Sequence, residues 1–189
     1  MPAPTSASAR KRCLAAIALA IGAAVAGGVP AHADSDDTLA LAIKATYLYK
    51  LPPFIAWPSD ALPSPASPFT LCVVGRDPFG EILDKAVAGQ RVMDRQVAVV
   101  RIDTAERDSP CQLMYVAPGA QPVDQALQAV AGAPILTVTD SVADGAKGIV
   151  NFIVRDNHIR LEINQAAASR NRLEISSKLL NVAASVIPK

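Results

Sequence analysis

This 189-residue chain has only two histidines and three cysteines, side chains that enzymes often use for nucleophilic or metal-assisted chemistry. Once a predicted N-terminal signal is removed, a single histidine, His158, remains, and no Gly-x-Ser-x-Gly motif marks a nucleophile. One histidine and two distant cysteines do not supply a tetrahedral metal site, and no acidic cluster has ligand spacing. The sequence therefore predicts a protein without enzymatic activity, metal or cofactor. A hydrolase that uses His158 at an unmarked site is the least favoured alternative.

Four polar residues at the ends of predicted buried strands are candidates for a ligand site. Arg76 and Asp77 follow one such strand, and Asp140 and Ser141 follow another. The carboxyl ends of parallel strands meet at one edge of a sheet, where open α/β proteins bind ligands. The stretch "GRDPFG" at 75–80 lacks both the lysine of a P-loop and the glycine spacing of a dinucleotide site. A small polar crevice is one interpretation of these residues, and ordinary loop and capping chemistry is the favoured one.

The N-terminal residues 1–33 have the three regions of a secretion signal. Three basic residues precede an apolar run of 17 residues, and "AHA" at 31–33 offers a small-x-small cleavage site. Cleavage would change the 18 basic and 17 acidic residues of the full chain to 15 and 17. The mature chain then has no basic patch of the kind that binds nucleic acid or an anionic membrane. We expect one exported domain at 34–189, with an uncleaved membrane anchor as the less favoured alternative.

Two cysteines, Cys72 and Cys111, remain after the signal is removed. An even number in an oxidising compartment favours one disulfide, which would close a loop of about 40 residues and contribute roughly 4 kcal/mol. Two buried free thiols are the alternative. Because the chain lacks a Cys-x-x-Cys motif, the role of such a disulfide would be structural.

The order of β-type and helical patterns predicts the fold. Four apolar runs read as buried strands: 69–75, 96–102, 112–118 and 134–140. Helical patterns between them give a β-α-β rhythm, which predicts a parallel sheet with helices on its faces. Two further runs, 149–154 and 158–163, are joined by Asp156-Asn157 and predict an antiparallel hairpin. The predicted class is α/β, with a mixed, mainly parallel sheet flanked by helices and a C-terminal antiparallel hairpin.

Two of the predicted helices have distinct capping and packing signals. The first follows the strand at 69–75, with Asp77 as N-cap, Pro78 as its first residue and Gly89 at its end. The second is a final amphipathic helix, whose apolar positions are Leu179, Leu180, Ala183 and Val186.

A further helix is predicted at 37–50, capped by Asp36 or Asp37 and ended by the prolines at 52 and 53. It carries two apolar stripes, so its face is wide enough to contact a partner as well as the core. Trp57, the chain's only tryptophan, follows it and is interpreted as a core anchor, with a recognition surface as the alternative. The predicted partner or dimer surface consists of Leu39, Ile43, Tyr47, Lys50 and Trp57.

Five segments stand in the order found in YfiR-like periplasmic proteins. They are "IKATYLYKLPPFIAWP", "FTLCVVGRDPFG", "CQLMYVAP", "ILTVTDS" and "IRLEINQAAASRNRLEISSKLLNVA". The chain resembles this family over residues 39–187. It departs from the family pattern at "KLPP", residues 50–53, and keeps the Trp57-Pro58 pair that follows.

The resemblance implies a periplasmic, dimeric α/β protein that binds the sensor domain of an inner-membrane diguanylate cyclase, as YfiR binds YfiN. Such binding would repress the synthesis of cyclic di-GMP. The resemblance also implies a disulfide between Cys72 and Cys111, although a second cysteine pair of YfiR is missing here. A small aromatic ligand is implied as well, without a defined pocket. The alternative function is a periplasmic small-ligand-binding protein that uses the crevice at the strand ends.

Overall fold

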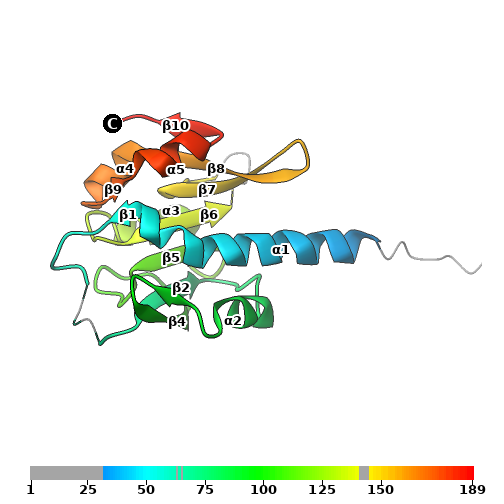
Figure 1. The fold of residues 1–189 in the computed structure, drawn as a ribbon, viewed down its shortest axis with the longest axis horizontal. Coiled ribbons are helices and arrows are strands. Elements are labelled where there is room, and N and C mark those ends of the chain that lie inside the picture. The colour runs from blue at the N-terminus through cyan, green and yellow to red at the C-terminus, as the bar shows by residue number, and fades with distance from the viewer. Residues whose placement is uncertain (1–31, 63, 65, 141–144) are drawn as a thin grey trace, which may run out of the picture. The chain divides into compact units, whose positions relative to one another are not determined.

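The computed structural model describes residues 32–62, 64, 66–140 and 145–189 (Figure 1). The predicted signal sequence lies almost wholly outside these ranges, as does Ser141, so the signal and its cleavage site stay predictions. None of the helices within the described ranges combines the length and the hydropathy of a membrane span.

Among the described residues, eight strands form one mixed sheet in the order β10-β8-β7-β6-β5-β2-β4-β3. The strands are β2 (Phe69–Val74), β3 (Arg91–Val92), β4 (Arg95–Ile102), β5 (Leu113–Val116), β6 (Leu136–Asp140), β7 (Val150–Arg155), β8 (His158–Asn164) and β10 (Ser185–Ile187). The five from β4 to β7 are parallel neighbours, which confirms the mainly parallel sheet that the β-α-β rhythm predicts.

The predicted C-terminal hairpin is present as β7 and β8, which pair antiparallel. Its turn residues Asp156 and Asn157 have φ angles of 51° and 58°, the left-handed values that short polar side chains tolerate best. The hairpin is not the edge of the sheet, however, because β10 pairs parallel to β8 outside it.

The five helices of the described ranges surround this sheet and a small second one. They are α1 (His32–Lys50), α2 (Glu81–Val87), α3 (Val123–Ala129), α4 (Gln165–Arg170) and α5 (Ser177–Val182), with a 3₁₀ turn η1 at Pro52–Phe54. The second sheet pairs β1 (Ile55–Ala56) with β9 (Glu174–Ile175). Helices α1 and α2 pack on one face of the large sheet and α3 on the other (Figure 1).

Alternation along the central strands explains why both faces are covered. In β2, Leu71 and Val73 belong to the core under α1 and α2, whereas Cys72 and Val74 belong to the core under α3. Cys72 is disulfide-bonded to Cys111, with their Cα atoms 5.8 Å apart, so the predicted pairing is confirmed. The bond ties β2 to the segment that enters β5, its parallel neighbour.

Three predicted helix boundaries are wrong. Helix α1 begins at His32, so Asp36 and Asp37 lie inside the helix and do not cap it. Helix α2 begins after Gly80, because Asp77 forms a tighter turn in which its Oδ1 accepts the backbone N–H of Phe79 at 2.7 Å. Helix α5 ends at Val182, and the chain beyond it becomes the edge strand β10.

Candidate functional site

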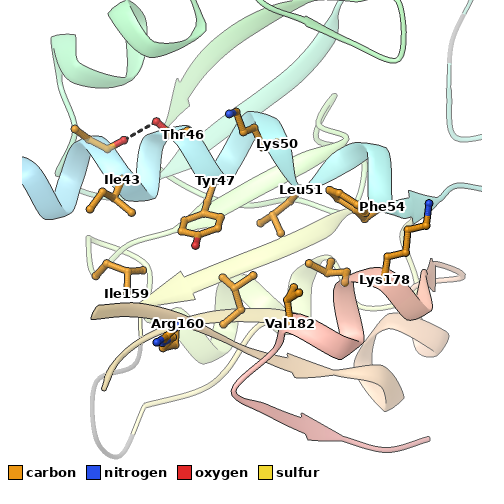
Figure 2. Close-up of a pocket in the computed structure, with 13 residues that line it drawn as sticks. Ile43, Thr46, Tyr47, Lys50, Leu51, Phe54, Ile159, Arg160, Lys178 and Val182 are labelled. Atoms are coloured by element: carbon orange, nitrogen blue, oxygen red, sulfur yellow. Dashed lines mark hydrogen bonds between the residues drawn. The ribbon is translucent and has the colours of Figure 1, made fainter. Parts of the chain in front are cut away.

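An open groove of about 880 Å³ lies between α1, β8 and α5, and we call it the α1 groove (Figure 2). Helix α1 contributes Ile43 and Tyr47, and Leu51 follows directly after its last residue with its backbone N–H bonded to the carbonyl oxygen of Tyr47. The three side chains recur every four residues and therefore lie along one side of the helix. Strand β8 and helix α5 supply most of the opposite wall, with Ile159 and Val182 facing the helix across the groove. Segments more than a hundred residues apart in sequence thus build one apolar depression.

Three of the five residues of the predicted partner or dimer surface line this groove, namely Ile43, Tyr47 and Lys50. Leu39, a residue that is 60% exposed, lies one helical turn before Ile43 and does not line the groove. The two apolar stripes predicted for this helix explain why some of its apolar residues are buried and others stay accessible. The inner stripe contains the buried Ala45 and Leu48, and the outer stripe remains accessible.

The remaining member of that predicted surface, Trp57, has a different environment. Its indole Nε1 donates a hydrogen bond to the carbonyl oxygen of Pro134 at 3.1 Å. Its ring meets the buried Phe69 edge to face, with centroids 5.8 Å apart. Trp57 does not line the α1 groove, and these contacts fit the anchor interpretation rather than a recognition role.

The α1 groove has basic side chains and no acidic ones. Lys50, Arg160 and Lys178 are among its lining residues, and none of the lining residues is Asp or Glu. None of these three cations takes part in the ion pairs found among the described residues. The sequence did not predict this charge pattern, because only the tertiary fold places Lys50, Arg160 and Lys178 around one groove.

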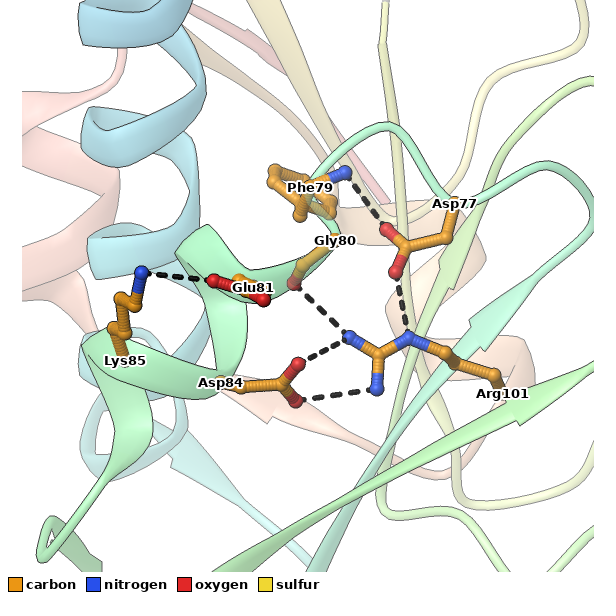
Figure 3. Close-up of polar contacts among 7 residues, drawn as sticks. All are labelled: Asp77, Phe79, Gly80, Glu81, Asp84, Lys85 and Arg101. Carbon is orange, nitrogen blue, oxygen red and sulfur yellow. Dashed lines mark hydrogen bonds and ion pairs between the residues drawn. The ribbon is translucent and has the colours of Figure 1, made fainter.

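The crevice residue Asp77 forms a structural ion pair with Arg101 (Figure 3). Arg101 of β4 places Nε 2.6 Å from Oδ2 of Asp77 and Nη2 2.9 Å from Oδ2 of Asp84, and it also bonds the carbonyl oxygen of Gly80 at 3.1 Å. The hydrogen bonds that the Arg101 guanidinium donates to Asp84 and Asp77 raise its pKa. This arrangement fixes the start of α2 against the sheet, and its only sequence signal was an arginine inside the apolar run at 96–102.

The crevice residue Asp140 is likewise engaged. Its Oδ1 lies 2.9 Å from Nζ of Lys44 in α1, and its Oδ2 accepts the hydroxyl proton of Tyr115 at 2.6 Å. Burial raises the pKa of Tyr115, with the nearby charge of Asp140 acting in the same direction. Tyr115 therefore stays protonated and acts as a hydrogen-bond donor.

The third described crevice residue, Arg76, lies in the loop that follows β2. The side chain of Arg76 is exposed, and its backbone N–H bonds the carbonyl oxygen of Pro118. Gly119 approaches so closely that an added Cβ would lie 2.6 Å from the Cα of Gly75. Close backbone contact fills the space between the ends of β2 and β5, which favours the interpretation as ordinary loop chemistry.

His158 gives the hydrolase hypothesis no support. It is exposed at the start of β8, and its Nδ1 lies 2.6 Å from the carbonyl oxygen of Asp156 in its own turn. In the part of the chain that the structure describes, no three His, Cys, Asp or Glu side chains are grouped so as to hold a metal ion.

A disulfide-bonded α/β domain with an open apolar groove beside its first helix has the features of a binding protein. Comparison with known families identifies it further: the model of the YfiR/HmsC-like family matches residues 41–184, and the chain belongs to that family. The family is a regulatory, non-catalytic family of periplasmic proteins. This confirms the resemblance found in the five sequence segments. A search of curated proteins gives no match.

Proposed function

We propose that this protein is a non-enzymatic periplasmic regulator that binds the periplasmic sensor domain of an inner-membrane diguanylate cyclase and represses cyclic di-GMP synthesis. The observation that carries the proposal is family membership over residues 41–184, which include the core, the disulfide and the α1 groove. The proposed action is a population shift. Binding one conformation of the sensor domain more tightly than the other holds the cyclase in its inactive state.

The α1 face is the surface that we assign to the partner. Ile43 and Val182, on the two walls of one groove, are 38% and 68% exposed. Contiguous exposed apolar surface on a soluble protein commonly marks an interaction site. Lys50 and Lys178 beside it favour a partner segment that has acidic residues around an apolar centre.

Self-association is part of the same proposal. Leu39 extends the exposed stripe of α1 beyond the groove, and we assign the homodimer contact to this N-terminal half of the helix. Such a contact leaves the groove open for a second occupant.

The alternative function, a ligand-binding protein that uses the strand-end crevice, has less support. Asp77 and Asp140 already have cationic partners, Arg101 and Lys44, at 2.6 and 2.9 Å. A ligand at this place would have to displace both ion pairs.

The test is deletion of the gene followed by complementation. Deletion should raise cyclic di-GMP, and the tagged wild-type protein should restore the low level and recover a diguanylate cyclase from solubilised inner membranes. Ile43→Asp, which puts a charge on the groove wall, should restore neither. Met93→Asp is the matched control, because Met93 is 40% exposed and lies in the β3–β4 turn, away from the groove. Unchanged cyclic di-GMP after deletion would refute the proposed function.

A further inference from the structure

One long strand of the large sheet has an unpaired outer side. In the part of the chain that the structure describes, β4 pairs with β2 along residues 97–102, but with β3 only at Arg95 and Gln96. Accessibility agrees with this pairing, since five of the six residues of β2 are buried and no residue of β4 is. The outer side of β4 beyond Gln96 is therefore open, near the lower border of the sheet in Figure 1.

Backbone hydrogen bonds show which groups of β4 point outward. The carbonyl oxygen of Ile102 accepts the N–H of Gly75, which follows β2, so Ile102 faces β2. Successive residues of a strand direct their N–H and C=O groups to opposite sides. It follows that Val97, Val99 and Arg101 face away from β2. Each of these three offers one donor and one acceptor to an added strand.

This edge lacks the features that usually keep an edge strand from pairing, which include proline, unpaired charges and a covering element. The stretch "VAVVR" at 97–101 has no proline, and its one charged residue is Arg101. The guanidinium of Arg101 already bonds the carboxylates of Asp77 and Asp84. The edge is thus nearly neutral as well as open, and it favours an uncharged extended segment over a charged one.

A depression of about 340 Å³ adjoins the same edge beside the end of α2. Its apolar lining residues are Val87, Val97 and Val99, and its polar ones include Gln90 and Gln96. Residues that stand directly opposite each other in an antiparallel pair have their side chains on the same face of the sheet. A residue added opposite Val97 or Val99 would therefore direct its side chain into this depression, which has room for one apolar side chain.

We infer that the outer edge of β4 is a strand-addition site. It binds an extended, uncharged segment of a partner protein antiparallel to residues 97–101, with one apolar side chain of that segment in the depression beside Val87. This surface is separate from the α1 groove, because β8 of that groove lies near the opposite end of the strand order. Both surfaces can be occupied at once, and this site does not depend on the cyclase proposed above.

A second copy of the chain is a poor occupant of this edge. Two-fold antiparallel pairing through all three outward residues centres on Val99. It would place Ile102 of the second copy opposite Gln96, at the position where Arg91 already pairs. A partner segment that ends or turns away opposite Val97 avoids this collision.

The experiment is amide hydrogen exchange of the purified mature protein, followed by NMR. In dilute protein the amides of Val97, Val99 and Arg101 should exchange at least tenfold faster than those of Ala98 and Val100, which face β2. The probe is a peptide of alternating valine and threonine with lysine ends. Its saturable binding should slow exchange of the three outward amides at least tenfold. The same peptide, N-methylated on the nitrogens that would face β4, should bind at least tenfold more weakly because it lacks the donors.

Two variants at one position locate the site. Val99→Pro removes an outward N–H, whereas Val99→Thr keeps the N–H and the β-branched shape. The proline variant should lose peptide binding, and the threonine variant should bind within about twofold of the wild type. Both should capture the cyclase normally, because the α1 groove is unchanged. Circular dichroism and the unfolding midpoint check that both fold, and the N-methylated peptide tests the wild type if the proline variant does not.

Four results would contradict the inference. Equal protection of outward and inward amides in dilute protein would show that the edge is already covered. Protection that appears only as the protein concentration rises would assign the edge to a second copy. Equal binding of the N-methylated peptide, or retained binding in a folded Val99→Pro variant, would exclude pairing through the backbone. Absence of saturable peptide binding together with normal cyclase capture would refute the strand-addition site and leave the proposed function standing.

Discussion

Lys44 of helix α1 and Asp140 at the carboxyl end of strand β6 form an ion pair of 2.9 Å that joins the outer helix to the sheet. Lys44 keeps 16% of its side chain exposed and Asp140 32%, so water screens the pair only in part. The hydroxyl of Tyr115 donates to the other oxygen of the same carboxylate. Asp140 is therefore the acceptor for one helix residue and one sheet residue.

Replacing Asp140 by alanine should lower the free energy of unfolding by about 2–4 kcal/mol, because it leaves the buried Tyr115 hydroxyl and the Lys44 ammonium without their acceptor. Urea unfolding at neutral pH measures this change. Lys44→Met should cost less, since the bond between Tyr115 and Asp140 survives and the new side chain is apolar. Asp103→Ala, at an exposed carboxylate, is the control. A loss in Asp140→Ala no larger than in this control would contradict the prediction.

Removing the disulfide with the double substitution Cys72→Ala and Cys111→Ala should cost roughly 4 kcal/mol, since the crosslink spans 39 residues and constrains the unfolded chain. The unfolding midpoint in urea, measured with and without reductant, tests this. Reductant should destabilise the wild type and leave the double variant unchanged. A wild-type midpoint that is insensitive to complete reduction, verified by thiol labelling, would show that the crosslink has no such effect.

Stability at low pH should depend on Glu162. A hydrogen bond from Lys147, at 2.7 Å, holds the pKa of Glu162 below its ordinary value of 4.5. Because the folded pKa is the lower one, the carboxylate stabilises the folded state above pH 4.5, and this contribution is lost as the pH falls through the folded pKa.

The free energy of unfolding should therefore fall less steeply in Glu162→Gln than in the wild type below about pH 4.5. Chemical denaturation at a series of pH values between about 7 and about 3 measures the two slopes. Glu106→Gln, at an exposed position, should keep the wild-type slope. Parallel curves for Glu162→Gln and the wild type would rule out this role.

Gly119→Ala should be more damaging than Gly89→Ala, although only Gly89 has a left-handed φ, of 71°. The new Cβ at position 119 would lie 2.6 Å from the backbone of Gly75, so the loops after β2 and β5 must move apart. We expect losses of about 3 kcal/mol at position 119 and about 1 kcal/mol at position 89, where the added Cβ would meet nothing within 4 Å. Thermal unfolding of the two variants compares them, and the reverse order would show that the loops are free to separate.

Local patterns predicted the parallel strands and the hairpin because each depends on a short stretch of sequence. The disulfide was predicted from the number of cysteines that remain after the signal is removed. The edge strand β10 was missed for the opposite reason. Val186 continues the helical spacing of Leu179 and Ala183, and only pairing with Ile163 of β8, a distant residue, makes it a strand.

Only the α1 wall of the groove was predicted from the sequence. The exposed stripe of α1 is periodic, so Ile43, Tyr47 and Lys50 were found. The opposite wall was not, since nothing local in Ile159 or Val182 shows that it will face a helix far away in the chain. Asp77 was predicted as a helix cap, but its partner Arg101 comes from a strand, and tertiary pairing took the place of the capping role.

The position of α1 beneath a late part of the chain has a consequence for how the protein is made. Its inward residues Ala45 and Leu48 share a core with Ile163 of β8 and with Leu173, which follows α4. If the chain is exported from its N-terminus, this helix leaves the membrane first and meets this part of its cover last. Until the C-terminal third has crossed, only earlier elements such as β2 and α2 are available to cover the inner stripe, and the rest of it stays open to water and to any chaperone that recognises apolar helices. Native folding in the periplasm is then a step that follows complete translocation, paced by contacts distant in sequence.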